Sequence, residues 1–284
     1  MRKATTCSIL ALALGLTACG QEQPGKPVAR AQIGTATPAD KSAASMPTDS
    51  ASATPSFASE VETSCRSVIY RDVPLTQCLA IPANNKITTA LAAGSDAPYR
   101  SLTAYAKGHD AATIAFAMSG GWFDDKGHPT GYFVQDSKRL QPLASDAKAN
   151  SGGVFYGTGD VWEIRTTKDF LANVTKRPEF GIQSGPMLVT NGRIDPVPHG
   201  KDAKPEIRSA AGIDDKGRAH FVISNAPVST EVLARFFATE LKVKNALCLD
   251  NGTSQLWSPA TDRLDTGEPI GPILVVEKRP ETPN

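Results

Sequence analysis

The sequence predicts an α+β fold: a single domain of many short strands and hairpins in a mixed twisted sheet, with a few helices. Three observations favour this class. Most apolar segments are short and are separated by turns that contain Gly, Asp or Asn. Two hairpin signals, Asn191-Gly192 and Asp215-Lys216-Gly217, lie between apolar runs. Only one long segment, 229–241, has a clear helical periodicity.

The amino terminus has the pattern of an export signal. Two basic residues precede an apolar run over 9–16, which is too short to span a bilayer and is followed by the tetrapeptide LTAC (16–19). This tetrapeptide resembles a bacterial lipobox, which is cleaved before the cysteine that then carries the lipid. We therefore expect residues 1–18 to be a lipoprotein signal peptide and Cys19 to be lipidated. The alternative is a soluble secreted protein in which Cys19 is incidental.

The residue after the cysteine, Gly20, is similar to the outer-membrane sorting pattern of lipoproteins. The expected location is therefore the cell envelope, on the periplasmic face of the outer membrane. Residues 19–60 are predicted to be a lipidated disordered tether, because 20–59 holds nine Ala, six Ser, five Pro and four Thr, with Phe57 the only aromatic residue. A coil of this length reaches on the order of 35 Å.

The remaining residues, 61–284, are long enough for a substantial core and are predicted to be the globular domain. The whole chain has a formal net charge of +1, which falls to −1 when the two basic residues of the signal are removed. A domain without a basic field does not attract nucleic acid, and we exclude that class of partner. Membrane contact is expected only through the lipid anchor, and the oligomeric state stays open.

The five cysteines divide by position. Cys7 leaves with the signal peptide and Cys19 takes the lipid. Cys65 and Cys78 flank two strand-like runs, and an oxidising periplasm favours a disulfide between them. Cys248 lies in an apolar strand with no neighbour that would activate a thiolate, so it is predicted to be a small buried hydrophobe.

The strands predicted first along the chain are 113–119, 131–136, 153–157 and 160–164, and the last two are joined by a tight turn with Gly. Weaker helical patterns cover 98–107 and 167–174.

In the main helix, Ser229 is the expected N-cap, and Val228 and Leu233 are expected to form a hydrophobic staple. This helix leads into the strand 246–249.

The familiar catalytic templates are missing from the sequence. The four histidines stand alone, no zinc pattern occurs, and the SGGWF stretch (119–123) lacks the Lys of a phosphate-binding loop. Ser184 lies one residue away from the pattern of a nucleophile elbow. A serine hydrolase acting through Ser184 therefore stays open as a weaker alternative.

Four loops rich in Gly and Ser begin or end apolar strands: 117–123, 149–155, 182–189 and 249–257. Such residues let a ligand approach the backbone closely and offer amide donors to anionic oxygens. Together with Arg208 on its own strand, they predict a polar cleft at one rim of the sheet. In the last loop, Asp250 is followed by the small polar residues 251–254.

Four segments carry a family resemblance: 119–136, 183–194, 207–237 and 245–259. In this order they resemble the bacterial phosphodiester glycosidases, relatives of the lysosomal enzyme that uncovers mannose 6-phosphate by removing N-acetylglucosamine. The resemblance covers roughly 61–278. It implies an α+β domain and the hydrolysis of a sugar-1-phosphodiester.

The resemblance also implies functional positions. The family's Asn-Gly-Gly-aromatic loop falls on Ser119, Gly120, Gly121 and Phe123, and its Gln-Ser-Gly-Pro loop falls on Gln183, Ser184, Gly185 and Pro186. The family's strand arginine falls on Arg208. Its Leu-Asp-Gly-Gly loop falls on Leu249, Asp250, Asn251 and Gly252. The chain departs from the family at Ser119 and Asn251, where Asn and Gly are usual, and at Gly153-Val154-Phe155. These departures indicate a different sugar or a loss of turnover, if the family's Asn side chains contact the substrate.

Asp250 and Arg208 are the predicted catalytic residues. A phosphate monoester is a good leaving group, so protonation of its oxygen by a strong general acid matters little. Neutralising its negative charge with the planar guanidinium of an arginine matters more. The structural alternatives are an Asp250 that caps local amides and an Arg208 that pairs with an acidic residue. The second carboxyl stays open among Asp124, Asp136 and Asp214.

The sequence thus predicts a hydrolase that cleaves a sugar-1-phosphodiester in a cell-envelope or environmental glycan. The alternative is a non-catalytic glycan- or phospho-glycan-binding lipoprotein on the same fold. The predicted substrate-binding residues are Ser119, Gly120, Gly121, Gln183, Ser184, Gly185, Asn251, Gly252 and Ser254. No cofactor is expected, and a bound divalent cation stays an open question, as do the sugar, the aglycone and the stereochemical outcome.

Overall fold

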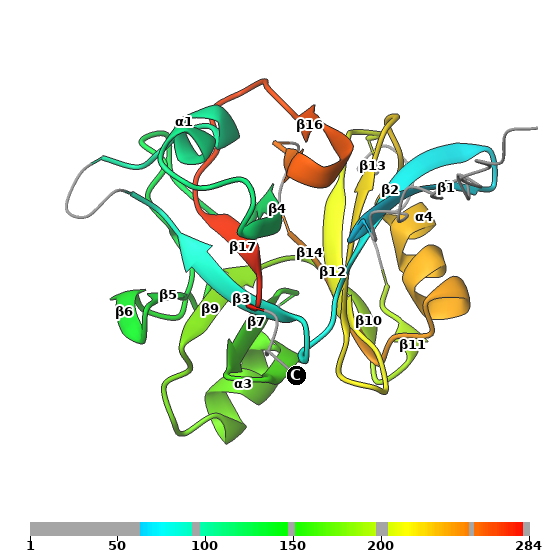
Figure 1. Ribbon diagram of the computed structural model, residues 1–284. Coiled ribbons are helices and arrows are strands. Elements are labelled where there is room, and N and C mark those ends of the chain that lie inside the picture. The colour runs from blue at the N-terminus through cyan, green and yellow to red at the C-terminus, as the bar shows by residue number, and fades with distance from the viewer. Residues whose placement is uncertain (1–62, 93–96, 147–150, 197–203, 250–252, 281–284) are drawn as a thin grey trace, which may run out of the picture. The chain divides into compact units, whose positions relative to one another are not determined.

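The structure is a computed structural model, and it describes residues 63–92, 97–146, 151–196, 204–249 and 253–280. Cys19, Asp250, Asn251 and Gly252 lie outside the described residues, so the predictions made for them stay predictions. The described residues all belong to one unit of the chain, 57–284, and their strands form three sheets (Figure 1).

The first sheet has seven strands in the order β1-β2-β13-β12-β14-β10-β11. Their bounds are β1 Cys65–Tyr70, β2 Val73–Ala80, β10 Met187–Thr190, β11 Arg193–Ile194, β12 Ser209–Ile213, β13 Ala219–Ser224 and β14 Asn245–Cys248. Both predicted hairpins are confirmed. Asn191 and Gly192 have positive φ angles of 51° and 76°, which suits a tight turn between twisted strands.

The second sheet has five strands in the order β16-β15-β4-β17-β3, and the third has five in the order β6-β5-β9-β7-β8. The strands of the second sheet are β3 Asn85–Ala90, β4 Ile114–Ser119, β15 Leu256–Ser258, β16 Arg263–Leu264 and β17 Ile273–Lys278. Those of the third are β5 Phe133–Gln135, β6 Lys138–Gln141, β7 Gly153–Thr158, β8 Val161–Thr166 and β9 Phe180–Ser184.

The predicted α+β class is confirmed, but the expected single mixed sheet is replaced by three sheets. Every strand pairing in these three sheets is antiparallel. In the hairpins, such as β1–β2, β7–β8 and β12–β13, the physical reason is the tight turn, which joins antiparallel neighbours. The other pairs join strands that are distant in sequence.

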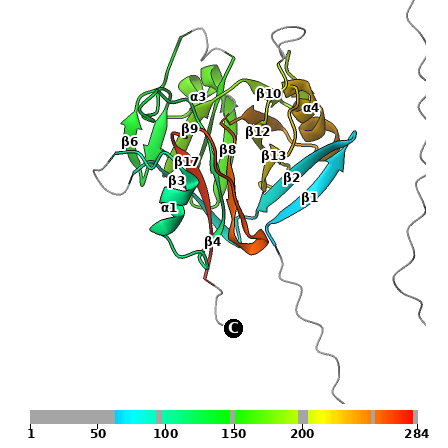
Figure 2. The ribbon, with the colours of Figure 1, turned by 90° about the horizontal axis from the view of Figure 1, so that it is seen from above.

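All three predicted helical segments are helical in the structure. They are α1 Leu102–Lys107, α3 Thr167–Asn173 and α4 Thr230–Arg235, and α4 continues as the π-helix η2 Phe236–Glu240. A 3-10 turn, η3, covers Pro259–Thr261. Ser229 is the N-cap of α4, as predicted, but its side chain makes no capping hydrogen bond. Figure 2 shows α4 beside the first sheet and α3 beside the third.

One core joins the three sheets. Phe221 of β13 lies with its ring centroid 5.1 Å from that of Phe116 in β4 and 5.8 Å from that of Phe155 in β7. All three side chains are buried. Because each ring comes from a different sheet, the sheets pack on a shared apolar centre rather than on separate ones.

The predicted disulfide is confirmed. Cys65 and Cys78 face each other across the β1–β2 pair and are bonded. Cys248 is buried and takes no part in this disulfide, in agreement with its expected packing role. Within the described ranges, no helix has the length and apolar character needed to cross a membrane.

Candidate functional site

The backbone carbonyl of Leu249 is the point where strand ends from all three sheets meet. It accepts a hydrogen bond of 2.7 Å from Ser184 Oγ, at the end of β9, and one of 2.5 Å from the N–H of Gly121, just beyond β4. The N–H of Leu249 donates to the carbonyl of Ser209, the first residue of β12, at 2.9 Å. Leu249 directly follows β14 and is fully buried. The residue before Asp250 is therefore fixed by three sheets at once.

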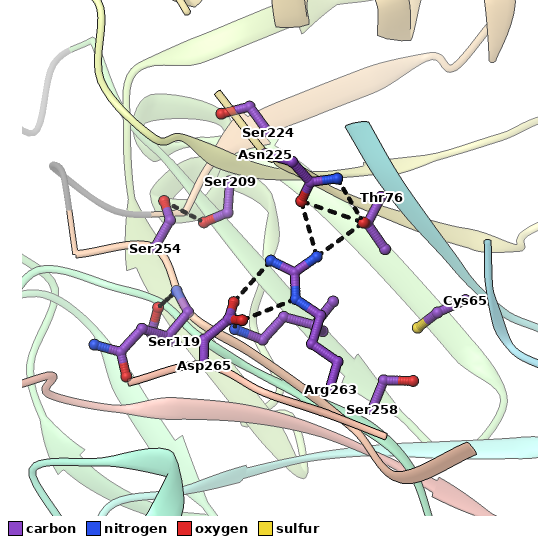
Figure 3. Close-up of polar contacts among 12 residues, drawn as sticks. Cys65, Thr76, Ser119, Ser209, Ser224, Asn225, Ser254, Ser258, Arg263 and Asp265 are labelled. Atoms are coloured by element: carbon purple, nitrogen blue, oxygen red, sulfur yellow. Dashed lines mark hydrogen bonds and ion pairs between the residues drawn. The ribbon is translucent and has the colours of Figure 1, made fainter. Parts of the chain in front are cut away.

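The chain beyond residue 252 is fixed at the same place. Ser119 Oγ donates to the carbonyl of Thr253 at 2.8 Å and accepts from the N–H of Gln255 at 2.9 Å. Ser254 Oγ lies 3.2 Å from Ser209 Oγ, and Figure 3 shows these two side chains facing each other. The described residues on both sides of 250–252 are thus held by serine hydroxyl groups.

We call Ser119, Gly121, Ser184, Ser209 and Leu249 the Leu249 junction. The sequence analysis expected four loops, 117–123, 149–155, 182–189 and 249–257, to lie together at one rim. The structure brings described residues of the first, third and fourth loops into contact at this junction, and Ser151 of the second accepts from the N–H of Met187 at 2.8 Å. Whether they enclose the predicted cleft stays a prediction.

The glycines of these loops pack against protein atoms. A Cβ on Gly121, whose φ is +88°, would lie 2.7 Å from the Ile182 side chain. A Cβ on Gly152 would lie 2.5 Å from the carbonyl oxygen of Ser184, and one on Gly185 would lie 2.8 Å from Gly152 Cα. The sequence analysis assigned such glycines to ligand approach. In the structure, the missing Cβ of these glycines allows the loops to pack closely against one another.

Gln183 is committed to the fold. Its Oε1 accepts from the N–H groups of Tyr132 and Ala144, both at 2.9 Å. Its Nε2 donates to the carbonyl of Ala144 at 3.0 Å and to Thr167 Oγ1 at 3.2 Å. An amide has two donors and one acceptor oxygen, so little capacity is left for a ligand. Contact with substrate stays a prediction for Gln183, and the geometry favours a positioning role.

The arrangement of Ser184 argues against the serine hydrolase alternative. Its hydroxyl is fully buried and donates to the Leu249 carbonyl at 2.7 Å. A nucleophilic serine needs its hydroxyl proton on a base such as His. Among the described residues, no histidine shares a hydrogen bond with Ser184.

Arg208 lies next to the junction, but its guanidinium contacts other groups. Nε donates to the carbonyl of Val228 at 3.2 Å and Nη2 to that of Lys204 at 2.9 Å, while Nη2 lies 3.4 Å from Glu206 Oε2. This ion pair with Glu206 is the structural alternative that the sequence analysis left open for Arg208. Nη1 makes no hydrogen bond to any described residue, which leaves one edge of the fork available.

The three candidates for a second carboxyl occupy different surroundings. Asp124 is exposed and accepts from the N–H groups of Lys126 and His128, and these bonds, the one from His128 first, lower its pKa. Asp136 is exposed in the turn between β5 and β6. Neither carboxylate forms a hydrogen bond or ion pair with a member of the Leu249 junction.

Asp214 lies beyond the far end of β12, opposite Ser209. Its Oδ2 accepts from Arg218 Nε at 2.6 Å and lies 3.1 Å from His220 Nε2, and its Oδ1 accepts two N–H groups. Burial raises the pKa of Asp214, but the hydrogen bonds, led by that from His220, outweigh it and lower the pKa overall. Burial also lowers the pKa of His220, against the opposing effect of Asp214. Asp214 is therefore a stable structural anion.

A second arginine near the junction was missed by the sequence analysis. Arg263 of β16 forms a bidentate pair with Asp265, at 2.9 Å and 2.8 Å, and its Nη1 donates to Thr76 Oγ1 and Asn225 Oδ1, both at 2.8 Å. Figure 3 shows this guanidinium among the three partners. Because Thr76 is far from Arg263 in sequence, no local pattern could have indicated the contact.

Within the described ranges, no three His, Cys, Asp or Glu side chains are grouped so that they could hold a metal ion.

The family model of the phosphodiester glycosidases matches residues 112–277. The uncharacterized protein YigE of Escherichia coli (strain K12) is 32% identical over 149 residues, which is 51% of this chain and 58% of that protein. The chain thus spans less than two thirds of that relative's length.

A solved structure shares the fold. It is the catalytic domain of zebrafish N-acetylglucosamine-1-phosphodiester alpha-N-acetylglucosaminidase, auto-inhibited by its pro-peptide. It aligns with a TM-score of 0.53 at 15% sequence identity and covers 76% of this chain and 82% of the zebrafish chain. At this identity the similarity concerns the fold alone.

Proposed function

Because the chain belongs to the phosphodiester glycosidase family, we propose that it hydrolyses a sugar-1-phosphodiester, with Asp250 as its catalytic carboxylate. One observation carries this proposal. Leu249, the residue before Asp250, is hydrogen bonded to groups from all three sheets. A fixed position next to a catalytic residue reduces the entropy that must be lost on reaching the transition state.

In the proposed reaction, the bond between the anomeric carbon and the phosphate oxygen breaks and the phosphate monoester leaves with the electron pair. Water supplies the hydroxyl that replaces it on the sugar. Asp250 either attacks the anomeric carbon or takes the proton of the attacking water, as the two routes of glycoside hydrolysis require. Arg208, through its available Nη1 edge, stabilises the negative charge that develops on the phosphate.

We also propose that the protein is a lipoprotein, with Cys19 lipidated and the domain on the periplasmic face of the outer membrane. The LTAC tetrapeptide and the residue after it support this location. Cell fractionation tests it. Wild-type protein is expected in the outer-membrane fraction, and Cys19→Ala in the soluble periplasm; an unchanged distribution would contradict the assignment.

The activity is tested with a panel of chromogenic sugar-1-phosphodiesters that differ only in the sugar. We expect release of the phosphate monoester with at least one sugar, and loss of this release in Asp250→Asn. Equal rates for wild type and Asp250→Asn would remove Asp250 from the mechanism.

The second candidate is a glycan- or phospho-glycan-binding lipoprotein without turnover, and one observation favours it. At the position where the family carries Asn, the Ser119 hydroxyl bonds Thr253 and Gln255 instead of facing a ligand. Under this candidate, calorimetry detects binding of a sugar-1-phosphate while no phosphodiester of the panel is cleaved. Ser119→Asn is then the substitution expected to gain turnover.

A further inference from the structure

A hollow with a volume of about 260 Å³ lies beside α3, on the face of the third sheet turned away from the shared core. Its apolar part is formed by Tyr132, Leu143, Phe170, Leu171 and Val174. The remaining lining residues are Arg139, Thr175, Lys176 and Arg177. We call these nine residues the basic hollow, because three of them are cations and none of them is acidic.

The three cations are not neutralised by the fold. The side chains of Arg139, Lys176 and Arg177 form no hydrogen bond or ion pair with any residue in the described part of the chain. Nearby Arg165 is different, since its guanidinium is held by Glu163 and Asp169 at 3.1 Å and 2.9 Å. A cationic pocket without internal partners presents its charge to a ligand from outside.

Two arginines and one phenol line the same hollow. Arg139, Arg177 and Tyr132 are all among its lining residues. Burial raises the pKa of the Tyr132 hydroxyl, and the positive charges of Arg139 and Arg177 oppose this rise. The Tyr132 ring packs on Phe170, with ring centroids 4.9 Å apart. The hollow therefore combines an aromatic wall with two guanidiniums.

One apolar side chain of the hollow is strongly exposed. Leu171 in α3 lines the hollow together with the three cations and is 71% exposed. An exposed leucine by itself needs no explanation. On a pocket with three unpaired cations, it matches an amphiphile whose anionic group is joined to acyl chains.

We propose that the basic hollow docks on the headgroup of an anionic phospholipid at a membrane surface. The lipid phosphate lies between Arg139 and Arg177, and Leu171 enters the boundary of the acyl chains. This contact adds a second membrane attachment to the expected lipid anchor. The basic hollow and the Leu249 junction lie on opposite faces of the third sheet, because the Ser184 side chain bonds Leu249 whereas the side chain of its neighbour Gln183 bonds Thr167 of α3. The membrane contact therefore does not depend on the proposed hydrolase activity.

The test uses the full chain carrying Cys19→Ser, so that no lipid is attached. Sedimentation with vesicles of pure phosphatidylcholine is compared with vesicles that contain 30% phosphatidylglycerol. Any binding by the apolar segment 9–16 is common to all variants. The variant Arg139→Ser/Arg177→Ser is compared with Arg193→Ser/Lys242→Ser, which removes the same charge from exposed positions elsewhere on the domain.

We expect phosphatidylglycerol to increase the bound fraction of the parent and of the control pair. The partition coefficient of Arg139→Ser/Arg177→Ser should fall by about tenfold or more. Leu171→Ser should lower it by a few-fold even at high salt. Equal binding by the two double variants, or no preference for phosphatidylglycerol, would overturn the proposal. A competition with inorganic phosphate separates the two sources of phosphate. If inorganic phosphate, at the same concentration as the lipid phosphate, displaced the protein from the vesicles, the ligand would be free phosphate and the proposal would be overturned.

Discussion

The two ends of strand β12 carry opposite kinds of chemistry. At Ser209, where the strand begins, neutral hydroxyls and backbone groups bond across three sheets. Beyond Ile213, where the strand ends, the buried carboxylate of Asp214 is surrounded by Arg218, His220 and two N–H donors. Asp214 is the more conspicuous acid, yet all its bonds are used within one hairpin. The neutral end instead fixes the residue that precedes Asp250.

The difference shows how a buried charge should be interpreted. A carboxylate with four donors is held as an anion and exchanges protons poorly with a substrate. A junction without charged side chains among its described members can instead hold a neighbouring acid in place. We therefore assign a structural role to the Asp214 end and propose a catalytic role for the Leu249 junction.

The largest expected effect separates the two acids directly. Asp250→Asn should lower kcat/KM by about 10³-fold with little change in melting temperature, because it removes the carboxylate that attacks or activates water. Asp214→Asn should keep most of the activity but lower the unfolding free energy by about 3 kcal/mol, because Arg218 loses its buried partner. Steady-state kinetics and thermal melts check both. If Asp214→Asn lost activity and Asp250→Asn lost stability instead, the structural and catalytic roles assigned to the two ends of β12 would have to be exchanged.

Arg208→Lys should lower turnover by about 10²-fold, because a lysine keeps the charge but loses the planar fork. Arg263→Lys is the matched control. It breaks the bidentate pair with Asp265, so it should lower the melting temperature more than the turnover. If Arg208→Lys kept full activity, Arg208 would have only a structural role, through its hydrogen bonds to Lys204 and Val228, and the phosphate would be bound by other residues.

The disulfide tests strands β1 and β2, which lie beside the Asp214 end: Cys78 pairs with Phe221, and Gln77 is hydrogen bonded to His220. Cys65 and Cys78 are separated by 13 residues, so removing the bond by Cys65→Ala/Cys78→Ala should cost about 3 kcal/mol of unfolding free energy. Activity per folded molecule should not change. Alkylation of the unreduced, denatured domain should label Cys248 and neither of the other two. Label on all three cysteines would refute the bond.

The smallest effect concerns acid stability at the Asp214 end. The pKa values of Asp214 and His220 are both lowered by folding, so each group contributes stability above its unfolded value. For His220 this contribution is lost as the pH falls below 6.5, its ordinary value, and for Asp214 below 3.8. His220→Gln should therefore show a shallower loss of stability between pH 7 and pH 5 than wild type. His109→Gln is the control, and denaturant unfolding at each pH is the measurement.

Local signals in the sequence were sufficient for the local structure. The Asn191-Gly192 hairpin, the 167–174 helix and the strand before Asp250 could be predicted because each depends on neighbouring residues. The partition into three sheets could not, since it depends on which strand edges pair across the fold. The Ser184–Leu249 and Ser119–Gln255 bonds join residues 65 and 136 positions apart, and no periodicity encodes them.

The candidate site shows the same limit. The family resemblance located the loops at 119–123 and 183–186, but it did not indicate that Gln183 is used up in bonds to Tyr132, Ala144 and Thr167. Nor did the strand pattern of Arg208 indicate that its guanidinium would bond carbonyls on either side of it. The direction of a polar side chain depends on tertiary partners, which a motif does not contain.

Hydrogen–deuterium exchange with and without a sugar 1-phosphate tests the central claim most directly, because it locates the ligand without relying on turnover. We predict protection of amides in peptides that contain Gly121, Ser184 and Leu249, and no change in peptides that cover Asp214 and His220. Protection confined to the Asp214 end would contradict the assignment of the Leu249 junction as the functional site.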